Sequence, residues 1–263
     1  MNLGLEGRVA LVLAASKGLG RATAAALAAE GCDVAIGARD EATLELTAAA
    51  IRAESGRRVI AIPIDVTDAV QCERFVASAL HALGRIDILV NNAGGPPFGS
   101  FDAFDDDAWR AAFELSQLST VRMTRLVLPH LPADGGGRII NVVSLSVKTY
   151  LAGSILSTAE RLGVVGMTKL LAEEVGPRGI TVNCVAPGVI LTDRVRTTRL
   201  RSLLDSGLSE EDALKKIAET IPMRRVGRPE ELGAVVAFLA STHASYVTGV
   251  TIPVDGGAVR AIG

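Results

Sequence analysis

Three polar residues in the middle of the chain are spaced so that they can act together. Ser144 ends a β-branched run, Ser157 follows thirteen residues later, and Arg161 comes four residues after that. A spacing of four places two side chains on the same face of a helix, one turn apart. Hydroxyl groups and a guanidinium can donate hydrogen bonds to a developing oxyanion, whereas Arg does not release its own proton. Such a set could stabilise negative charge that develops on an oxygen atom during a reaction.

A glycine-containing turn near the N-terminus predicts a phosphate-binding site. It reads Ser16-Lys17-Gly18-Leu19-Gly20 and lies between a predicted strand at 8–13 and an alanine-rich helix. The glycines remove the Cβ atoms that would obstruct a pyrophosphate, and the helix start offers unpaired N–H groups and a positive dipole end. Such a turn by itself is weak evidence for a phosphate-binding site, so the prediction depends on the motifs that follow it.

Later predicted strands each end in a short polar or glycine-containing motif. These motifs are Asp65-Val66, Asn91-Asn92-Ala93-Gly94, Pro187-Gly188 with Ile190 and Thr192, and Val254-Asp255-Gly256-Gly257. In this order, and covering nearly the whole chain, they resemble the short-chain dehydrogenase/reductase family, and most of all its 3-oxoacyl-carrier-protein reductase branch. The resemblance implies a nicotinamide cofactor and hydride transfer between a carbonyl and an alcohol.

The catalytic positions of this family are altered here. The resemblance implies that a Ser positions the substrate carbonyl, a Tyr passes a proton to it, a Lys lowers the pKa of the Tyr and holds the ribose, and an Asn anchors a water relay. Ser144 matches the first position, whereas Ser157, Arg161 and Ser116 stand at the Tyr, Lys and Asn positions. Tyr150 offers a phenol nearby, but its place in a loop favours lining a pocket over catalysis.

The resemblance also implies which residues bind the cofactor. Asn92, Ala93 and Gly94 are expected beneath the adenosine and ribose, and the residues from Pro187 onward are expected to face the nicotinamide. The full predicted set is Ser16, Lys17, Gly18, Leu19, Gly20, Arg39, Asp65, Val66, Asn92, Ala93, Gly94, Arg161, Pro187, Gly188, Ile190 and Thr192.

Two positive residues favour NADP(H) over NAD(H). Lys17 lies in the glycine turn, and Arg39 follows the second predicted strand, where Ala38 stands in place of an acid that would repel a 2′-phosphate. The alternative is that both are ordinary solvated charges, and Asp40 next to Arg39 weakens the case. Ala14, at the usual place of the first glycine of the turn, should cost little if its φ is negative.

Composition and charge are those of a compact soluble enzyme. The 263 residues are 49% hydrophobic and 21% charged, with a net charge of −2, which favours one domain over 1–263 and gives no reason to expect nucleic-acid binding. Residues 1–7 are too short and polar for a signal peptide, and no apolar run is long enough to span a membrane, so a cytoplasmic location is expected. The scattered cysteines and histidines predict reduced core or surface roles and no metal site. The cysteines are Cys32, Cys72 and Cys184.

Short β-branched runs alternate with alanine- and leucine-rich segments. This pattern predicts a Rossmann-type α/β fold, a doubly wound parallel sheet of about seven strands with helices on both faces. The strands are expected near 8–13, 33–37, 59–63, 87–90, 138–143, 180–185 and 250–254.

Several helix boundaries can be predicted as well. We expect the first helix to end before Gly31, a helix to run from Asp105-Asp106-Asp107 to Pro129, and another to begin at Pro229. The segment 192–228 interrupts the alternation as a charged insertion that, by resemblance, covers the substrate.

The leading hypothesis is an NADP(H)-dependent oxidoreductase with an atypical catalytic set. A second hypothesis is a nucleotide-binding pseudoenzyme or regulatory subunit, motivated by the changes at Ser157 and Arg161. A third is a lyase or isomerase in which Arg161 holds an anionic substrate. By resemblance, the apolar, glycine-rich end of the chain at 251–263 is expected to pair subunits in a homodimer or homotetramer.

Overall fold

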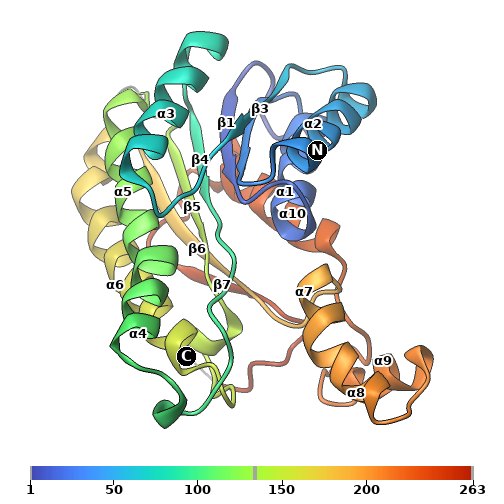
Figure 1. The fold of residues 1–263 in the computed structure, drawn as a ribbon. Coiled ribbons are helices and arrows are strands. Elements are labelled where there is room, and N and C mark those ends of the chain that lie inside the picture. The colour runs from blue at the N-terminus through green and yellow to red at the C-terminus, as the bar shows by residue number, and fades with distance from the viewer. Residues whose placement is uncertain (1, 133–134, 262–263) are drawn as a thin grey trace.

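A parallel sheet of seven strands forms the centre of the molecule (Figure 1). The computed structural model describes residues 2–132 and 135–261, and within them the strand order is β3-β2-β1-β4-β5-β6-β7. The strands are β1 Val9–Leu13, β2 Asp33–Ala38, β3 Val59–Pro63, β4 Ile88–Asn91, β5 Arg138–Val142, β6 Thr181–Pro187 and β7 Thr251–Val254. The predicted strands and the doubly wound class are confirmed.

The chain changes direction across the sheet at β1. This strand pairs in parallel with β2 on one side and with β4 on the other. In an open α/β sheet, the loops that follow two strands at such a switch point diverge and leave a crevice at their carboxyl ends. The turn after Leu13 and the loop after Asn91 therefore open onto the same crevice.

Helices cover both faces of the sheet. One buried cluster joins Leu27 of α1 and Leu232 of α10 to Val12 of β1. A second cluster joins Phe75 of α3 and Met123 of α5 to Leu11, the neighbouring residue of the same strand. Because alternate residues of a strand point to opposite faces, each face has its own apolar core. Both layers are visible in Figure 1.

The helices begin and end close to the predicted boundaries. The main ones are α1 Gly18–Ala29, α2 Glu41–Ser55, α3 Ala69–Leu83, α4 Asp106–Phe113, α5 Ser119–Val127, α6 Ile155–Val175 and α10 Pro229–Ala240. Short turns of helix occupy η1 Phe101–Ala103, η3 Leu128–His130, η4 Leu145–Val147, η5 Gly176–Arg178 and η7 Thr242–Ala244. The first helix ends before Gly31, which has a φ of +97°, a value that suits glycine after a helix C-terminus.

The helical stretch predicted from Asp105 to Pro129 is present but not uniform. Asp105 caps its start by accepting a hydrogen bond from the Ala108 N–H at 2.9 Å. Between α4 and α5 the chain forms a π-helical segment, η2, over Glu114–Leu118, which includes Ser116. A π-helical turn inserts an extra residue into the ladder and is frequent at functional sites.

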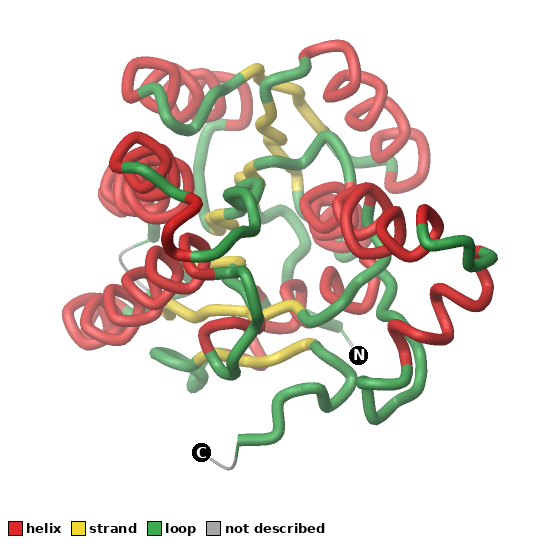
Figure 2. The backbone as a smooth tube through the Cα atoms, turned by 60° about the horizontal axis from the view of Figure 1, so that its bottom comes forward, coloured by secondary structure: helices red, strands yellow, loops and turns green. Residues whose placement is uncertain are grey.

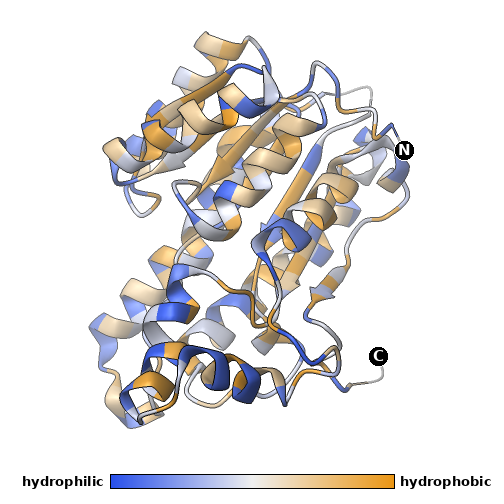
Figure 3. Cartoon of the chain, turned by 90° about the vertical axis from the view of Figure 1, so that its right-hand side faces the viewer, coloured by the Kyte–Doolittle hydropathy of each residue, from blue (hydrophilic) through white to orange (hydrophobic). Residues whose placement is uncertain are grey.

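The predicted insertion forms a separate helical segment beside the sheet. Between β6 and α10 it contains α7 Asp193–Val195, η6 Arg196–Leu200, α8 Arg201–Asp205 and α9 Glu210–Ala218. Its small apolar cluster, which includes Leu200, Ala213 and Ile217, is distinct from the two sheet cores. The tube in Figure 2 shows these helices projecting from the layered body, and Figure 3 shows hydrophilic and hydrophobic residues alternating along them.

The cysteines lie in the core as predicted. All three are free and buried, and burial raises the pKa of the Cys32 thiol to about 12. Such thiols stay protonated and unreactive at neutral pH. Among the described residues, no helix combines the length and apolar character needed to cross a lipid bilayer.

Candidate active site

The turn after β1 is folded tightly against its neighbours. The Asn92 side chain donates hydrogen bonds to the carbonyl oxygens of Leu13 and Ala14, at 3.2 and 3.5 Å. A Cβ atom on Gly20 would lie only 2.3 Å from the Ala14 oxygen, so the glycine is required by the packing. Thr47 donates a hydrogen bond to the Ser16 carbonyl at 2.7 Å and ties the turn to α2.

The backbone of Ala14 does not meet the condition under which this substitution would cost little. Its φ is +49°, in the left-handed region. For a residue with a side chain, this conformation costs roughly 1–2 kcal/mol. The cost follows from the turn itself, because the Ala14 carbonyl must point at once toward Gly20 and toward the Asn92 amide. The glycine turn therefore forms in spite of this substitution.

The other end of the turn meets the segment that follows β6. Gly18 has a φ of +57°, and a Cβ atom there would lie 3.4 Å from the Thr192 methyl group. Lys17 forms an ion pair with Asp193 at 3.7 Å. Together these residues leave a backbone cradle at the start of α1, which fits a pyrophosphate because glycine backbone and helix N–H groups face it.

The predicted adenosine end lies beyond the tip of β2. Arg39 is exposed there, and it lies close enough to Asp65 to help hold the pKa of that carboxyl below its usual range, behind the larger effect of the hydrogen bond from the Thr67 N–H. Lys17 contributes in the same direction to Asp40, after the hydrogen bonds from Thr43. The positive charges of Lys17 and Arg39 therefore both act at the same end of the sheet.

Arg161 is the most constrained of the predicted catalytic residues. It lies on α6 with only 7% of its surface exposed, and its Nη1 donates a hydrogen bond to the Val142 carbonyl at 2.6 Å. Val142 ends β5, two residues before Ser144. Burial, and then the nearby charge of Arg194, lower the pKa of Arg161 to about 10. It is still a cation at neutral pH.

Ser144 begins the loop that leads from β5 toward α6. Its Oγ accepts hydrogen bonds from the N–H and the hydroxyl of Ser146, at 3.2 and 3.0 Å. Because both of these contacts use its oxygen as an acceptor, the hydroxyl proton of Ser144 is free to point to a ligand. Ser157 lies partly buried in the first turn of α6, one turn before Arg161.

Ser116 supplies a buried hydroxyl that lacks a partner. It is 3% exposed, and among the described residues no hydrogen bond satisfies its Oγ. The next residue, Gln117, packs so closely over Gly163 that a Cβ atom there would lie 2.5 Å from its Oε1. The π-helical segment is thus pressed against α6 near Arg161. An unsatisfied buried hydroxyl costs about 1–3 kcal/mol, so this position suits a bound water or ligand group.

One prediction about the cleft is wrong. Tyr150 was expected to line a pocket, but 89% of its surface is exposed and it does not line the cavity described below. The side chain of Ile190 is buried in the main core, and its place beside the nicotinamide stays a prediction. Pro187 and Gly188 do lie at the carboxyl end of β6, where Gly188 touches Asp255 so closely that a Cβ atom would lie 2.7 Å from its Cα.

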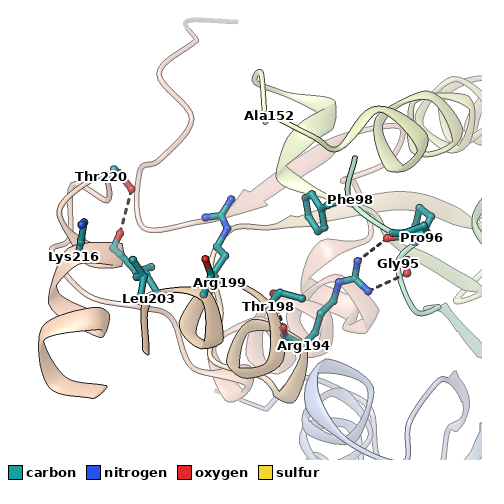
Figure 4. A pocket seen from close by; sticks show the side chains of 13 residues that line it. Gly95, Pro96, Phe98, Ala152, Arg194, Thr198, Arg199, Leu203, Lys216 and Thr220 are labelled. Atoms are coloured by element: carbon teal, nitrogen blue, oxygen red, sulfur yellow. Dashed lines mark hydrogen bonds between the residues drawn. The ribbon is translucent and has the colours of Figure 1, made fainter. Parts of the chain in front are cut away.

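A cavity of about 680 Å³ opens between the insertion and the loop that follows β4, and the sequence did not predict it (Figure 4). It is lined by Gly95, Pro96, Pro97, Phe98, Ala152, Arg194, Thr198, Arg199, Ser202, Leu203, Lys216, Ile217 and Thr220. Gly95 to Phe98 continue directly from the predicted cofactor motif, and Ala152 lies in the loop between Ser144 and Ser157. This cavity therefore adjoins the catalytic positions without containing them.

Arg194 holds the wall of this cavity together. Its guanidinium donates hydrogen bonds to the carbonyl oxygens of Gly95 and Pro96 at 2.9 and 2.8 Å, and lies 5.6 Å from the centre of the Phe98 ring. The insertion is thereby attached to the loop after β4. No sequence pattern indicates this contact, because the two segments lie about a hundred residues apart.

The strand order, the glycine cradle and the loops at the switch point define a Rossmann-type dinucleotide-binding protein. Comparison with known proteins makes this more specific, since a family model described as "Enoyl-(Acyl carrier protein) reductase" matches residues 13–259. The chain belongs to the short-chain dehydrogenase/reductase family.

Individual relatives match along almost their whole length. Nodulation protein G of Azospirillum brasilense is 38% identical, over 95% of this chain and 97% of that protein. The 3-oxoacyl-(acyl-carrier-protein) reductase of Vibrio harveyi is also 38% identical, over 97% and 98%. The solved L-sorbose reductase from Gluconobacter frateurii, complexed with NADPH and L-sorbose, superposes with a TM-score of 0.95 at 32% identity and covers 100% of both chains.

Proposed function

We propose that this protein is an NADP(H)-dependent oxidoreductase that interconverts a carbonyl and an alcohol, with Ser144, Ser157 and Arg161 as its catalytic set. The observation that supports this most directly is the position of Arg161, a buried cation hydrogen-bonded to the end of β5 beside Ser144. A buried charge is costly, and it is worth keeping where negative charge develops during a reaction.

The glycine turn fits a dinucleotide, since Gly18 carries no Cβ atom at the start of α1 and Gly20 lets the turn pack closely against Ala14. When bound, a nicotinamide cofactor would supply or accept the hydride. Lys17, Arg39 and the absence of an acid at Ala38 support NADP(H), because a 2′-phosphate gains from cations and is repelled by a carboxylate. The NADPH complex of the sorbose reductase is consistent with this choice.

The remaining chemistry follows from the residues at the end of β5. Ser144 donates its free hydroxyl proton as a hydrogen bond to the carbonyl oxygen and so orients the substrate. The field of Arg161 stabilises the negative charge that builds up on that oxygen. Ser157 donates a second hydrogen bond to the carbonyl oxygen. Its hydroxyl is too weak an acid to ionise, so it can pass a proton from water to that oxygen only if it gains one proton as it gives up the other. We expect slower turnover than in an enzyme that has a Tyr and a Lys at positions 157 and 161.

The test is a titration of NADPH and NADH fluorescence, followed by NADPH oxidation with a panel of ketones, quinones and 3-oxoacyl thioesters. We expect NADPH to bind more tightly than NADH and to be oxidised in the presence of at least one carbonyl class. Tight binding without any oxidation would contradict a reductase and favour a nucleotide-binding pseudoenzyme. If no nucleotide binds, the remaining hypothesis is that the protein is a lyase or an isomerase.

Substitutions at position 161 test the proposed set. Arg161→Ala should weaken NADPH binding and lower kcat about a hundredfold, because removal of one oxyanion-stabilising donor typically costs roughly 10²–10³ in rate. Arg161→Lys keeps a cation and should recover part of both losses. Ser157→Tyr combined with Arg161→Lys should raise activity on generic ketones. Unchanged kinetics in Arg161→Ala would remove this residue from the mechanism.

A homo-oligomer, dimer or tetramer, is part of the same proposal. Leu162 and Leu170 lie eight residues apart on α6, and 47% and 69% of their surfaces are exposed. Residues at this spacing share one helix face, so α6 presents an apolar stripe that another subunit could cover. Sedimentation of a monomer would contradict this. The three unoxidised cysteines suit a reducing compartment, so we also propose a cytoplasmic location, testable by fractionation.

A further inference from the structure

The charges that line the cavity beside the catalytic positions are all positive. Arg194, Arg199 and Lys216 contribute side chains, and among the described residues no Asp or Glu lines it. The protein as a whole has a net charge of −2, so this local excess of cations is not a property of the general surface. A cavity lined by one sign of charge concentrates ligands of the opposite sign.

None of these three cations is in an ion pair within the described residues, whereas several of their neighbours in the sequence are. Arg194 is hydrogen-bonded to backbone carbonyl oxygens, but Arg199 and Lys216 take part in no ion pair, although α9 begins with three acidic residues. By contrast, Arg196 pairs with Glu210 at 2.9 Å, Arg201 with Asp205 at 2.9 Å, and Lys215 with Glu211 at 2.7 Å. These three cations, which do not line the cavity, are therefore neutralised, whereas Arg199 and Lys216 are not.

The two unpaired cations come from different helices. Arg199 belongs to η6 and Lys216 to α9, and Figure 4 shows the two side chains at separate places along the cavity, with Leu203 between them in this view. An Arg fork and a Lys ammonium can each bind an oxygen of a carboxylate or a phosphate.

The rest of the cavity is suited to an apolar group. Pro96, Phe98, Ala152, Leu203 and Ile217 line it, and a volume of about 680 Å³ is ordinary for a small-molecule site. Arg194 is already committed to the Gly95 and Pro96 carbonyl oxygens, so it shapes the wall and leaves ligand binding to the other two cations.

We propose that Arg199 and Lys216 select the substrate by binding an anionic group at its far end. The substrate class is then an apolar carbonyl compound with a carboxylate or phosphate, whose apolar body extends along Phe98 and Ala152 toward Ser144. This rests on the proposed reductase function for the carbonyl, but the anion site is defined by the cavity alone.

The first test measures binding and needs no turnover. With NADPH saturating, we would titrate 8-anilinonaphthalene-1-sulfonate, an apolar anion, and N-phenyl-1-naphthylamine, which lacks the sulfonate. The variant Arg199→Gln with Lys216→Gln is compared with Arg201→Gln with Lys215→Gln. The control removes the same two charges from the same two helical regions, but from positions that do not line the cavity.

We expect the cavity variant to bind the sulfonate about tenfold more weakly and the neutral dye as before, and the control to bind both as the wild type does. Thermal melts and NADPH titrations should match in all three proteins, because the substituted side chains are exposed. No sulfonate binding by the wild type, an unchanged affinity in the cavity variant, or an equal loss in the control would overturn the anion site.

The second test uses turnover with three matched sets of medium-chain ketones: oxocarboxylates, their methyl esters, and oxoalkyl phosphates. We expect a higher kcat/KM for the anionic members, and the loss of this preference in the cavity variant alone. The better of carboxylate and phosphate identifies the group. If sulfonate binding behaves as expected but no ketone is reduced, the reductase function fails and the anion site stands. If esters and acids are reduced equally, the anion site fails.

Discussion

The cofactor turn and the insertion over the cavity are built in opposite ways. Around the turn after β1, backbone groups and glycines touch at distances that leave no room for a single Cβ atom, as between Gly20 and Ala14. In the insertion, a small apolar cluster supports helices whose exposed side chains are joined mainly by surface ion pairs. The first region is specified by close packing and the second by surface charge, and surface charges tolerate change much better than close packing does.

This contrast predicts that an added side chain in the cofactor turn destabilises the whole protein, whereas substitutions in the insertion alter only what is bound. Four changes test the packing and charge at the cofactor side and the start of α10, and they are ordered by the size of the expected effect.

Gly20→Ala should have the largest effect. The new methyl group would lie 2.3 Å from the Ala14 oxygen, so the turn must shift. We expect the free energy of unfolding to fall by about 3 kcal/mol, as in overpacked cores, and NADPH affinity to fall with it. Gly166→Ala on α6 is the control, since a Cβ atom there meets open space and should be neutral or slightly stabilising. Urea denaturation measures both, and equal behaviour of the two variants would break the contrast.

Arg39→Ala should change cofactor choice without changing stability. Loss of a charged contact to a 2′-phosphate should weaken NADPH binding roughly tenfold, given about 1.5 kcal/mol for such a hydrogen bond. NADH, which lacks that phosphate, is the internal control and should bind as before. Fluorescence titration of both nucleotides measures the ratio. A parallel loss for NADH would show that Arg39 acts on the fold and not on the phosphate.

Ala14→Gly should stabilise the protein. Ala14 has a φ of +49°, which glycine adopts without the steric cost of a Cβ atom. We expect the free energy of unfolding to rise by about 1 kcal/mol, measured by denaturation in urea. A decrease would mean that the Ala14 methyl group contributes packing that outweighs its strain.

Glu231→Gln should have a small, pH-dependent effect at the start of α10. The Glu231 carboxylate accepts hydrogen bonds from Arg225 Nη1 and the Arg228 N–H, both at 2.8 Å, and chiefly the Arg225 contact lowers its pKa from 4.5 to about 2. Because the folded-state pKa is depressed, the stabilisation is full above pH 4.5 and is lost as the pH falls through about 2. Melting temperatures of the variant should lie below those of the wild type near pH 7 and converge with them near pH 2. A constant difference across this range would exclude the carboxylate charge as its cause.

The fold was predictable because its signals are local. The seven strands and the start of the helix after Asp105 follow from β-branched runs and capping residues that lie next to each other in the chain. The π-helical segment at Ser116 was not predictable, since it depends on how Gln117 packs over Gly163 of α6. Local propensity describes an isolated helix, whereas an inserted turn responds to the neighbouring helix.

The sequence predicted which residues form the candidate site better than it predicted how they are arranged. The spacing of Ser144, Ser157 and Arg161 placed them in one region, but the hydrogen bond from Arg161 to Val142 required the observed approach of α6 to β5. The prediction that Tyr150 lines a pocket is wrong, because its side chain is exposed. Tyr150 lies in an irregular segment, where no periodicity indicates which way a side chain points.

The sequence by itself determined the order of strands and helices, the glycine turn, the cations suited to NADP(H) and the unusual residues at the catalytic positions. Each of these is a property of residue type and spacing along the chain. Only the tertiary structure decided the left-handed backbone of Ala14, the burial of Arg161, and which cations around the cavity are paired and which are free. These features depend on contacts between segments far apart in the sequence, and a local sequence pattern does not indicate which distant segments come into contact.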